Sequence, residues 1–323
     1  MTIHPIAEKI LFSLKSCTDY ISGEQLSNQL SISRCAIWKH IQELRNLGYL
    51  IEAVPHLGYR IIKTPDRLLS YEIKWKLPAK IMGKKIYYFD TAASTMDIAY
   101  NLAKENSPEG TVVVAEFQTK ARGRFNRPWL CWRYKGIYFS FILRPKIHPN
   151  RSAIFSLLTA VALVEAINNV TQIYTEVKWP NDIILEGKKL AGILTELEAE
   201  MEQTHFMVIG VGINVNNLSH QLVEKAISLR QYKKENIDRV ELMRQILIKL
   251  EEHYLLFKQK GADFILYKWR MHSNTLGKMV KIIQNNTTIT GIAVDVDNDG
   301  NLLLRRETGL IERINAGDLI YCD

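Results

Sequence analysis

The chain has 323 residues, of which 47% are hydrophobic, and a formal net charge of +8. This length and composition predict two or three domains with real cores and exclude a low-complexity protein. The surplus of positive charge allows contact with a polyanion but does not by itself establish one.

The first sixty residues predict three short helices followed by a hairpin. Residues 6–17 have helical periodicity, and residues 22–25 (Ser-Gly-Glu-Gln) fit a capping box that opens a second helix. Ser33 is expected to cap a third helix, and residues 54–60 are expected to form a hairpin, or wing. These features predict a winged helix-turn-helix. The buried face of the third helix is expected to consist of Ile37, Ile41 and Leu44.

The third helix is the predicted DNA contact. Such a helix enters the major groove, with its N-terminal residues near base edges and its cations near phosphates. Trp38 is ambiguous, because it could pack inward as easily as face DNA. The alternative is a small helical interaction domain with an ordinary charged face, but the agreement of turn, caps, stripe and wing favours DNA binding. The expected DNA-binding residues are Ser33, Arg34, Trp38, Lys39, Gln42 and Arg45.

From Lys84 onward the sequence alternates between strand and helix patterns. The apolar stretch 152–169 predicts a buried helix, because polar residues interrupt it and it is shorter than a membrane span of about 20 residues. Ser94 and Thr95 are expected to cap a helix that begins near Met96 or Asp97. The domain is therefore predicted to be α+β, a mixed sheet with helices on one side. The predicted strands are 86–89, 111–116, 136–143, 176–179, 183–185, 189–198 and 206–215.

Three polar segments, far apart in the chain, form the candidate site. Residues 118–129 hold arginines around a glycine, residues 178–182 place an amide and a carboxylate after a Trp-Pro step, and residues 189–196 begin an apolar strand with a lysine. Clustered cations suit a substrate that carries phosphate and carboxylate groups. Each segment alone has an ordinary explanation as a solvated loop, a structural turn or a surface lysine. Their joint occurrence is specific, whereas a dinucleotide-binding glycine pattern and a P-loop are both absent from the sequence.

Residues 275–323 predict a small β-barrel with a turn at Asn298-Asp-Gly300. This segment has no catalytic pattern of its own. A barrel that only packs against the central domain is as plausible as one that binds a carrier protein. The predicted strands are 280–283, 287–296, 302–305 and 311–314.

In order and spacing, these segments resemble the biotin–protein ligases, and the N-terminal domain resembles that of the biotin operon repressors in that family. The resemblance implies a helix-turn-helix domain at 1–65, a biotin- and ATP-binding domain at 66–272 and an SH3-like domain at 273–323. It implies that ATP and Mg²⁺ activate biotin as biotinyl-5'-AMP, which passes to a lysine of a biotin carrier protein domain. It also implies biotin-dependent repression at operator DNA by a homodimer that forms when biotinyl-AMP is bound.

The resemblance also implies roles for residues of the three segments. Lys189, Arg122 and Arg124 are the expected catalytic residues, because preorganised positive charge lowers the barrier between a carboxylate and a phosphate. Asp182 is an expected indirect partner of magnesium, while direct metal ligands stay unknown. The expected biotin-binding residues are Ser94, Thr95, Met96, Gln118, Arg122, Gly123, Arg124, Lys189 and Gly192. The expected ATP-binding residues are Arg124, Arg127, Trp129, Asn181, Asp182 and Asn214.

Three positions depart from the family pattern. Ala121 and Asn126 stand at glycine positions of the arginine segment, and Met96 stands where the family usually has asparagine. Asparagine tolerates a positive φ, whereas alanine would cost about 1–2 kcal/mol if its position required the left-handed region. These departures bear on ligand affinity more than on the type of reaction.

Two other functions remain open from the sequence. One is a regulator that senses biotin or its adenylate with weak or no ligase activity, against which the retained Lys189 and arginines argue. The other is ligation of lipoate or octanoate on a related scaffold. The segment at 178–182 followed by that at 189–196, together with the helix-turn-helix, favours biotin instead. The four cysteines form no CxxC pair and the N-terminus lacks a signal-peptide pattern, so a cytoplasmic protein without membrane contact is expected.

Overall fold

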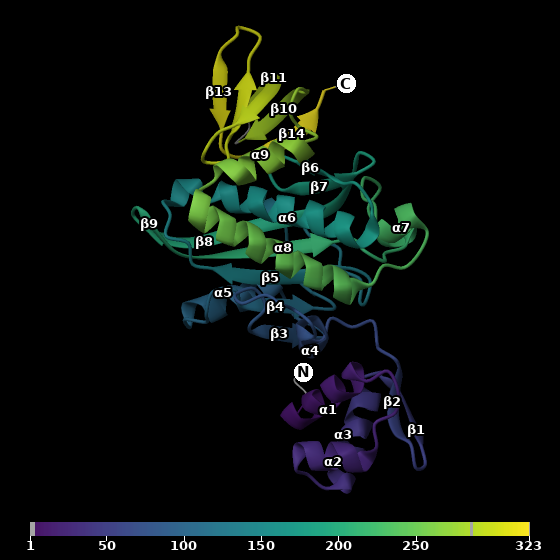
Figure 1. Cartoon of the computed structure of the whole chain (residues 1–323). Helices are drawn as coiled ribbons and strands as arrows, with labels where there is room; N and C mark the ends of the chain where they lie inside the picture. Colours follow the sequence, from purple (N-terminus) through teal and green to yellow (C-terminus); the bar gives the residue numbers. More distant parts are fainter. Residues whose placement is uncertain (1–3, 285–286, 323) are drawn as a thin grey trace. The chain divides into compact units, whose positions relative to one another are not determined.

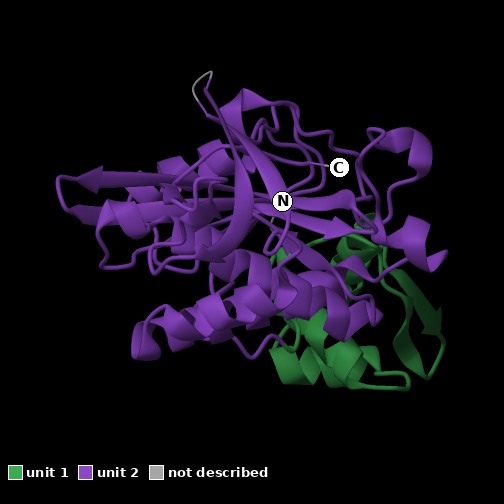
Figure 2. Cartoon of the chain, turned by 90° about the horizontal axis from the view of Figure 1, so that it is seen from above, with its two compact units in different colours: residues 1–76 green, residues 77–323 purple. Residues whose placement is uncertain are grey.

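The structure is a computed structural model that describes residues 4–284 and 287–322. It divides into two compact units, unit 1 (Met1–Lys76) and unit 2 (Leu77–Asp323), which are coloured separately in Figure 2. The C-terminal strands belong to unit 2. The division into domains at 1–65, 66–272 and 273–323 stays a prediction.

From residue 4 onward, where the structure describes it, unit 1 contains three helices, a two-stranded antiparallel hairpin and a short fourth helix. Ser22 and Gln25 form the predicted capping box, and Ser33 Oγ accepts from the N–H of Ala36 at 3.2 Å, so both predicted caps are confirmed. The predicted core stripe of the third helix is fully buried. The elements are α1 (Pro5–Ser16), α2 (Gly23–Leu30), α3 (Arg34–Asn46), β1 (Leu50–Val54), β2 (Gly58–Lys63) and α4 (Ser70–Lys74).

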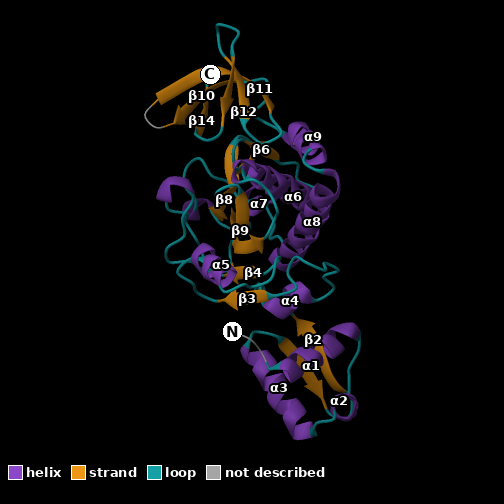
Figure 3. Ribbon diagram, turned by 90° about the vertical axis from the view of Figure 1, so that its left-hand side faces the viewer, coloured by secondary structure: helices purple, strands orange, loops and turns teal. Residues whose placement is uncertain are grey.

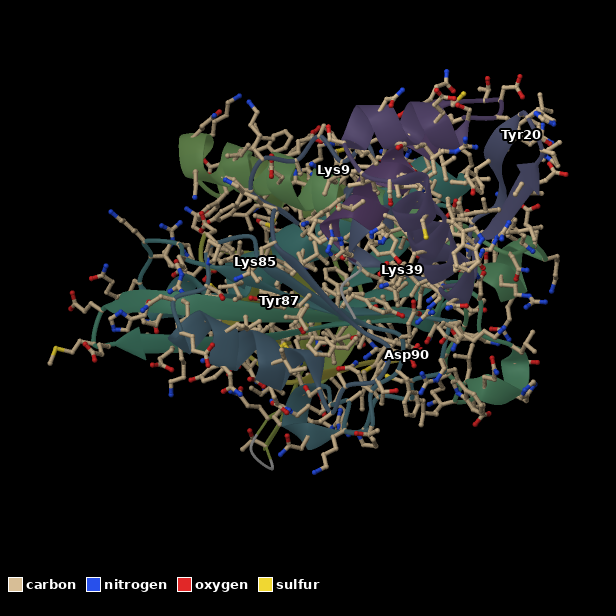
Figure 4. The ribbon with its side chains drawn as sticks, turned by 90° about the horizontal axis from the view of Figure 1, so that it is seen from below. Lys9, Tyr20, Lys39, Lys85, Tyr87 and Asp90 are labelled. Atoms are coloured by element: carbon tan, nitrogen blue, oxygen red, sulfur yellow. The ribbon has the colours of Figure 1, made fainter. Side chains whose placement is uncertain are left out.

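The hairpin is the predicted wing, although its strands extend beyond the predicted residues 54–60 at both ends. Tyr20, which precedes α2, holds it in place and lies beside it in Figure 4. The Tyr20 hydroxyl donates to Glu52 of β1 at 2.5 Å, and the Arg60 guanidinium lies 4.5 Å from the Tyr20 ring centroid. The wing is thus fixed to the helices by an aromatic side chain that local patterns did not indicate.

The segment after residue 65 is tied to unit 1 by the buried carboxylate of Glu72 on α4. Lys15 of α1 donates to one of its oxygens, and the Tyr49 hydroxyl donates to the other. Phe12 of α1 packs against Trp75 with ring centroids 5.1 Å apart. These contacts explain why the compact unit continues to Lys76.

Unit 2 is built on a seven-stranded mixed sheet of order β3-β4-β5-β9-β8-β7-β6, shown in Figure 1. β3 and β4 are parallel, and every other neighbouring pair is antiparallel. The strands are β3 (Ile86–Phe89), β4 (Val112–Ala115), β5 (Ile137–Leu143), β6 (Glu176–Lys178), β7 (Asp182–Leu185), β8 (Lys188–Glu200) and β9 (Gln203–Ile213). Each contains or overlaps the strand predicted for it.

Helices cover both faces of this sheet, so the expectation of one covered side was wrong. The helices are α5 (Thr95–Lys104), α6 (Ala153–Thr171), α7 (Leu229–Lys233), α8 (Arg239–Lys260) and α9 (Asp263–His272). Leu194 of β8 packs in the core beneath α5, while its neighbour Thr195 bonds Ser156 of α6 at 2.9 Å. Successive strand residues point to opposite faces, and Figure 3 shows α5 on one side of the sheet with α6 and α8 on the other. Helical periodicity indicates a buried helix face but not which face of the sheet it covers.

The apolar helix α6 is a core helix. With the turn before it, residues Pro149–Thr171 are long and apolar enough for a membrane span, but 67% of the 18-residue window that meets this criterion is buried inside the protein. This burial confirms the prediction from residues 152–169. Helices α8 and α9, by contrast, were not predicted individually.

The C-terminal segment forms a five-stranded antiparallel sheet of order β13-β12-β11-β10-β14. One of its contacts with the larger sheet is made by Trp179, whose indole N–H donates to the Gly300 carbonyl at 3.2 Å and whose backbone N–H donates to Thr275 Oγ1 at 3.0 Å. The last strand was missed by the sequence analysis. The strands are β10 (Met279–Gln284), β11 (Thr287–Val296), β12 (Leu302–Arg305), β13 (Ile311–Ile314) and β14 (Asp318–Tyr321).

Candidate active site

The three predicted segments line one cavity of about 290 Å³ in unit 2. The segment 118–129, called the arginine loop below, meets β8 and β9 and the turn between β6 and β7 there. Most of the predicted site residues are therefore brought together. Those that line the cavity are Met96, Gln118, Arg122, Gly123, Arg124, Arg127, Trp129, Asn181, Asp182, Lys189, Gly192 and Asn214.

Trp129 lies against a pair of glycines on adjacent strands. Gly192 of β8 pairs with Gly212 of β9, and a Cβ added to either would lie 3.1 Å or 2.7 Å, respectively, from the indole ring. Glycine at both positions is what allows the ring to lie so close to the sheet. Trp129 Nε1 is buried and, within the described residues, has no hydrogen-bond partner. The ring therefore offers a buried donor to a ligand.

Lys189 stands at the start of β8 with its ammonium in the cavity. Its Nζ lies 2.7 Å from Asp182 Oδ1 and 5.6 Å from the centroid of the Trp129 ring. The β7–β8 register shifts between Ile183 and Ile184, next to Asp182 in β7 and opposite Lys189 in β8. The result is a lysine–aspartate ion pair against an aromatic wall.

The three arginines of the loop have different partners. Arg122 Nη1 lies 2.7 Å from Asp97 Oδ1 and its Nη2 lies 3.1 Å from Glu196 Oε1, while Arg127 pairs with Asp318. Arg124 donates instead to two neutral acceptors, the Gly317 carbonyl at 3.0 Å and Asn181 Oδ1 at 3.4 Å.

Arg124 differs from Arg122, Arg127 and Lys189 because it makes no ion pair with a carboxylate among the contacts described above. Burial lowers the pKa of Arg124, and the more distant charges of Asp318 and Asp182 act against that shift. A guanidinium stays protonated even so. Among the described cations that line the cavity, Arg124 is therefore the one whose charge an anionic ligand would stabilise most.

Gln118 is held in one orientation by its neighbours. Its Oε1 accepts from the Thr95 N–H at 2.7 Å and from Thr95 Oγ1 at 3.1 Å, and its Nε2 lies 3.7 Å from Cys131 Sγ. Burial raises the pKa of the Cys131 thiol to about 11, with Gln118 acting against the shift, so the sulfur is a neutral partner.

Ser94 and Thr95 do not line the cavity, in contrast to their predicted contact with biotin. Ser94 Oγ caps α5 by accepting from the Asp97 N–H at 3.4 Å, and Thr95 Oγ1 also bonds Ser140 Oγ at 2.8 Å. Both residues are buried. In this structure their hydroxyls position α5 and Gln118, and their contact with biotin stays a prediction.

Met96 gives the cavity an apolar wall where the family usually has asparagine. Met96 is 4% exposed, and a Cβ added to Gly210 would lie 2.5 Å from its sulfur. Glycine at position 210 thus makes room for the methionine.

The left-handed positions of the arginine loop differ from those expected. Phe125 and Asn126 have φ of +56° and +54°, whereas Ala121 is not among the described residues with positive φ. The condition for strain at Ala121, a left-handed backbone, is therefore not met in this structure. Asn126 adopts a conformation that asparagine tolerates, as predicted.

Sequence reasoning missed part of the lining. The segment after Asn216 folds back so that Leu222, Val223 and Ala226 line the cavity, and the Lys189 N–H donates to the Lys225 carbonyl at 2.9 Å. Asp318 of β14 also lines it. No local pattern marks these residues, because their role depends on contacts between distant segments.

The predicted DNA-binding residues lie on or beside α3. Trp38 is 56% exposed, which resolves its ambiguity in favour of an outward orientation, and Arg34 and Lys39 are also exposed. Gln42 is half-buried. Arg45 Nη2 donates to the Ile51 carbonyl at 2.7 Å, so its guanidinium holds the wing strand β1.

Three family descriptions match successive parts of the chain. Residues 88–214 match the biotin/lipoate A/B protein ligase family, residues 7–60 match an HTH domain, and residues 275–320 match the biotin protein ligase C-terminal domain. The bifunctional ligase/repressor BirA of Bacillus spizizenii is 41% identical, over 96% of this chain and 96% of its own length. The chain belongs to the BirA family.

Other BirA relatives and solved ligases agree with this assignment. BirA of Escherichia coli K12 is 30% identical over 96% of this chain and 95% of its own. The biotin protein ligase from Aquifex aeolicus, solved in complex with biotin and ATP, has 30% identity and a TM-score of 0.63, covering 74% of this chain and 99% of that one. The predicted resemblance and the predicted α+β fold are both confirmed.

Proposed function

We propose that this BirA-family chain forms biotinyl-5'-AMP from biotin and ATP, transfers the biotin to a lysine of a carrier domain, and represses transcription at operator DNA. The observation that best supports this reaction is that two cations, Arg124 and Lys189, line the same cavity. Arg124 is half-buried and its hydrogen-bond partners are neutral. A carboxylate and a phosphate meeting there are both anions, so they satisfy a site that concentrates positive charge.

In the first step, a biotin carboxylate oxygen attacks the α-phosphorus of ATP, the bond to the bridging oxygen breaks, and pyrophosphate leaves. Negative charge accumulates on the phosphoryl oxygens as the two anions approach. Lys189 and Arg124 supply fixed positive charge at that place and need little reorganisation. The unpartnered Nε1 of Trp129 would donate to the bound ligand.

In the second step, the uncharged amine of the carrier lysine attacks the acyl carbon of the adenylate. An amide forms, AMP leaves with the electron pair, and the amine loses a proton. Arg124 and Lys189 stabilise the departing phosphate as they did the first transition state.

Magnesium fits this site as a companion of the ATP phosphates. Among the described residues, no group of three or more His, Cys, Asp or Glu could hold a metal. Mg²⁺ is commonly held by one or two carboxylates together with substrate phosphates. Asp182 and Asp318 line the cavity and would supply such carboxylates, in exchange for part of their pairing with Lys189 and Arg127. When bound, the ion would offset triphosphate charge.

Incubation with labelled biotin, ATP and a carrier domain tests the reaction. We expect label on one carrier lysine only when ATP is present, and a carrier whose lysine is replaced by arginine is the control. Binding of biotin without transfer would support the alternative, a biotin-sensing regulator. Preferential transfer of labelled lipoate would overturn the choice of substrate.

Repression is proposed to use a homodimer in the cytoplasm that biotinyl-AMP favours. One module exposes few cations on α3, mainly Arg34 and Lys39, because Arg45 is engaged with Ile51. Specific DNA complexes usually need a larger interface, which two copies on a palindromic site would supply. Sedimentation and operator binding, with and without biotin plus ATP, test the coupling. Equal dimer fraction and equal DNA affinity in both conditions would contradict it.

A further inference from the structure

The tip of the arginine loop is attached to unit 2 by its side chains. The Gly123 N–H donates to the Arg127 carbonyl at 2.8 Å, and the Trp129 N–H donates to the Ala121 carbonyl at 3.0 Å. Across the part of the chain that the structure describes, the backbone hydrogen bonds of residues 121–129 stay within the loop. Its closure over the cavity therefore depends on what its side chains bind.

The loop is anchored on two sides. Arg124 and Arg127 reach the C-terminal sheet, at the Gly317 carbonyl and at Asp318. On the other side, Arg122 places one terminal nitrogen on Asp97 of α5 and the other on Glu196 of β8. Both elements contribute to the cavity wall, since Met96 precedes Asp97 and Leu194 lies two residues before Glu196.

We propose that Asp97 and Glu196 form an ionic clasp on Arg122 that holds the arginine loop closed and slows the release of bound ligand. They are positioning residues, because they act on the ligand only through the loop. The proposal deepens the proposed function and rests on it where the ligand is biotinyl-5'-AMP. Slow release matters for that intermediate, because an adenylate that escapes before transfer is lost to the reaction.

The strength of the clasp should depend on salt. The Arg122, Asp97 and Glu196 side chains are 26%, 51% and 33% exposed, so ions in solution can screen them. Exposed ion pairs contribute modestly one at a time. Two carboxylates on one guanidinium, from two elements, should together produce a measurable change in the rate of loop opening.

A matched pair of charges lies on the same two elements. Lys104 of α5 and Glu198 of β8 are 3.9 Å apart, and neither lines the cavity. The substitution Lys104→Gln removes an ion pair between α5 and β8 without touching the arginine loop. It separates an effect on the loop from a general loosening of the helix on the sheet.

The test uses the full chain with Asp97→Asn, Glu196→Gln, both together, and Lys104→Gln. Labelled biotinyl-5'-AMP is formed on the enzyme and chased with excess unlabelled adenylate, and labelled biotin alone is followed in parallel. We expect release from the double variant to be about 3- to 10-fold faster than from the unmodified chain, and each single variant to lie between. Raising KCl should accelerate release from the unmodified chain. In the double variant, the same rise in KCl should change the logarithm of the release rate by less than about half as much.

Pyrophosphate exchange at saturating biotin and ATP is measured on every variant. Little change there with faster release supports the clasp, whereas absence of exchange in the unmodified chain would contradict the proposed reaction instead. In that case release of biotin alone still tests the clasp. Equal release rates in the double variant and the unmodified chain, or an equal acceleration in Lys104→Gln, would overturn the proposal, and thermal melting shows that each variant is folded.

Discussion

Helix α3 of unit 1 and the cavity of unit 2 are built in opposite ways. Helix α3 is specified by residues within its own thirteen positions and the cap before it. The cavity is assembled from segments that are distant in sequence, with Arg124 bonded to Gly317 and Gln118 bonded to Thr95. Local patterns thus specify elements, whereas contacts between distant segments determine which side chains meet in a site.

The largest effect should come from a contact that sequence patterns do not reveal. Arg239 at the start of α8 donates to Glu116, 123 positions earlier, at 2.8 Å, and to the Gly136 carbonyl at 2.9 Å. Both side chains of the ion pair are fully buried. We expect Arg239→Met to lower the free energy of unfolding by about 3–5 kcal/mol, because it leaves a buried carboxylate without its cation.

Urea denaturation measures this change, with Arg306→Met as the control. Arg306 pairs with Glu312 at 2.8 Å, but both side chains are more than one-third exposed. The control should lose no more than about 1 kcal/mol. Similar losses in the two variants would show that the long-range buried pair is not a major determinant of stability.

The second largest effect should fall on catalysis rather than folding. Lys189→Ala removes the ammonium beside Asp182 and Trp129, and we expect adenylate formation to fall about 10²- to 10³-fold. Pyrophosphate exchange measures the rate. The neighbouring, exposed Lys188 provides the control Lys188→Ala, which should change little. A nearly unchanged rate in Lys189→Ala would contradict the assigned role.

The sequence allowed most strands and both N-terminal caps to be predicted, because these depend on short-range patterns. The capping box at Ser22 and Gln25 needs only four residues. The sequence also indicated which segments meet in the cavity, because residues 118–129, 178–182 and 189–196 together resemble one family. The individual contacts between these segments could not be predicted.

What could not be predicted depends on the folded backbone. Ser94 and Thr95 were expected to face the ligand, yet their hydroxyls bond Asp97, Ser140 and Gln118. Ala121 stands at a glycine position of the family, yet it is not among the described residues with positive φ. Asp318 lines the cavity because β14 pairs with β10, a pairing that no local pattern marked.

A smaller effect is expected where the sequence was sufficient. Ser33→Ala should destabilise α3 by about 1 kcal/mol, because the first turn loses the acceptor of the Ala36 N–H. Hydrogen exchange of the α3 amides measures it. Ser152 occupies the N-cap of α6 without a side-chain cap bond, so Ser152→Ala should leave α6 exchange nearly unchanged. Equal protection losses in the two helices would argue against the cap as the cause.

The smallest effect should be at Ala121, where family resemblance and structure disagree. If position 121 required the left-handed region, Ala121→Gly would relieve strain and tighten biotin binding. The described φ values place that requirement at Phe125 and Asn126 instead. Glycine at 121 then only raises the conformational entropy of the loop when no ligand is bound. Biotin affinity should therefore fall by about 2- to 5-fold, equivalent to about 0.4–1 kcal/mol. Asn126→Ala is the internal standard, because alanine tolerates φ near +54° less well than asparagine. This variant should lose more biotin affinity than Ala121→Gly does. Calorimetry on both variants decides the matter: tighter binding in Ala121→Gly would mean that residue 121 turns left-handed when the ligand is bound.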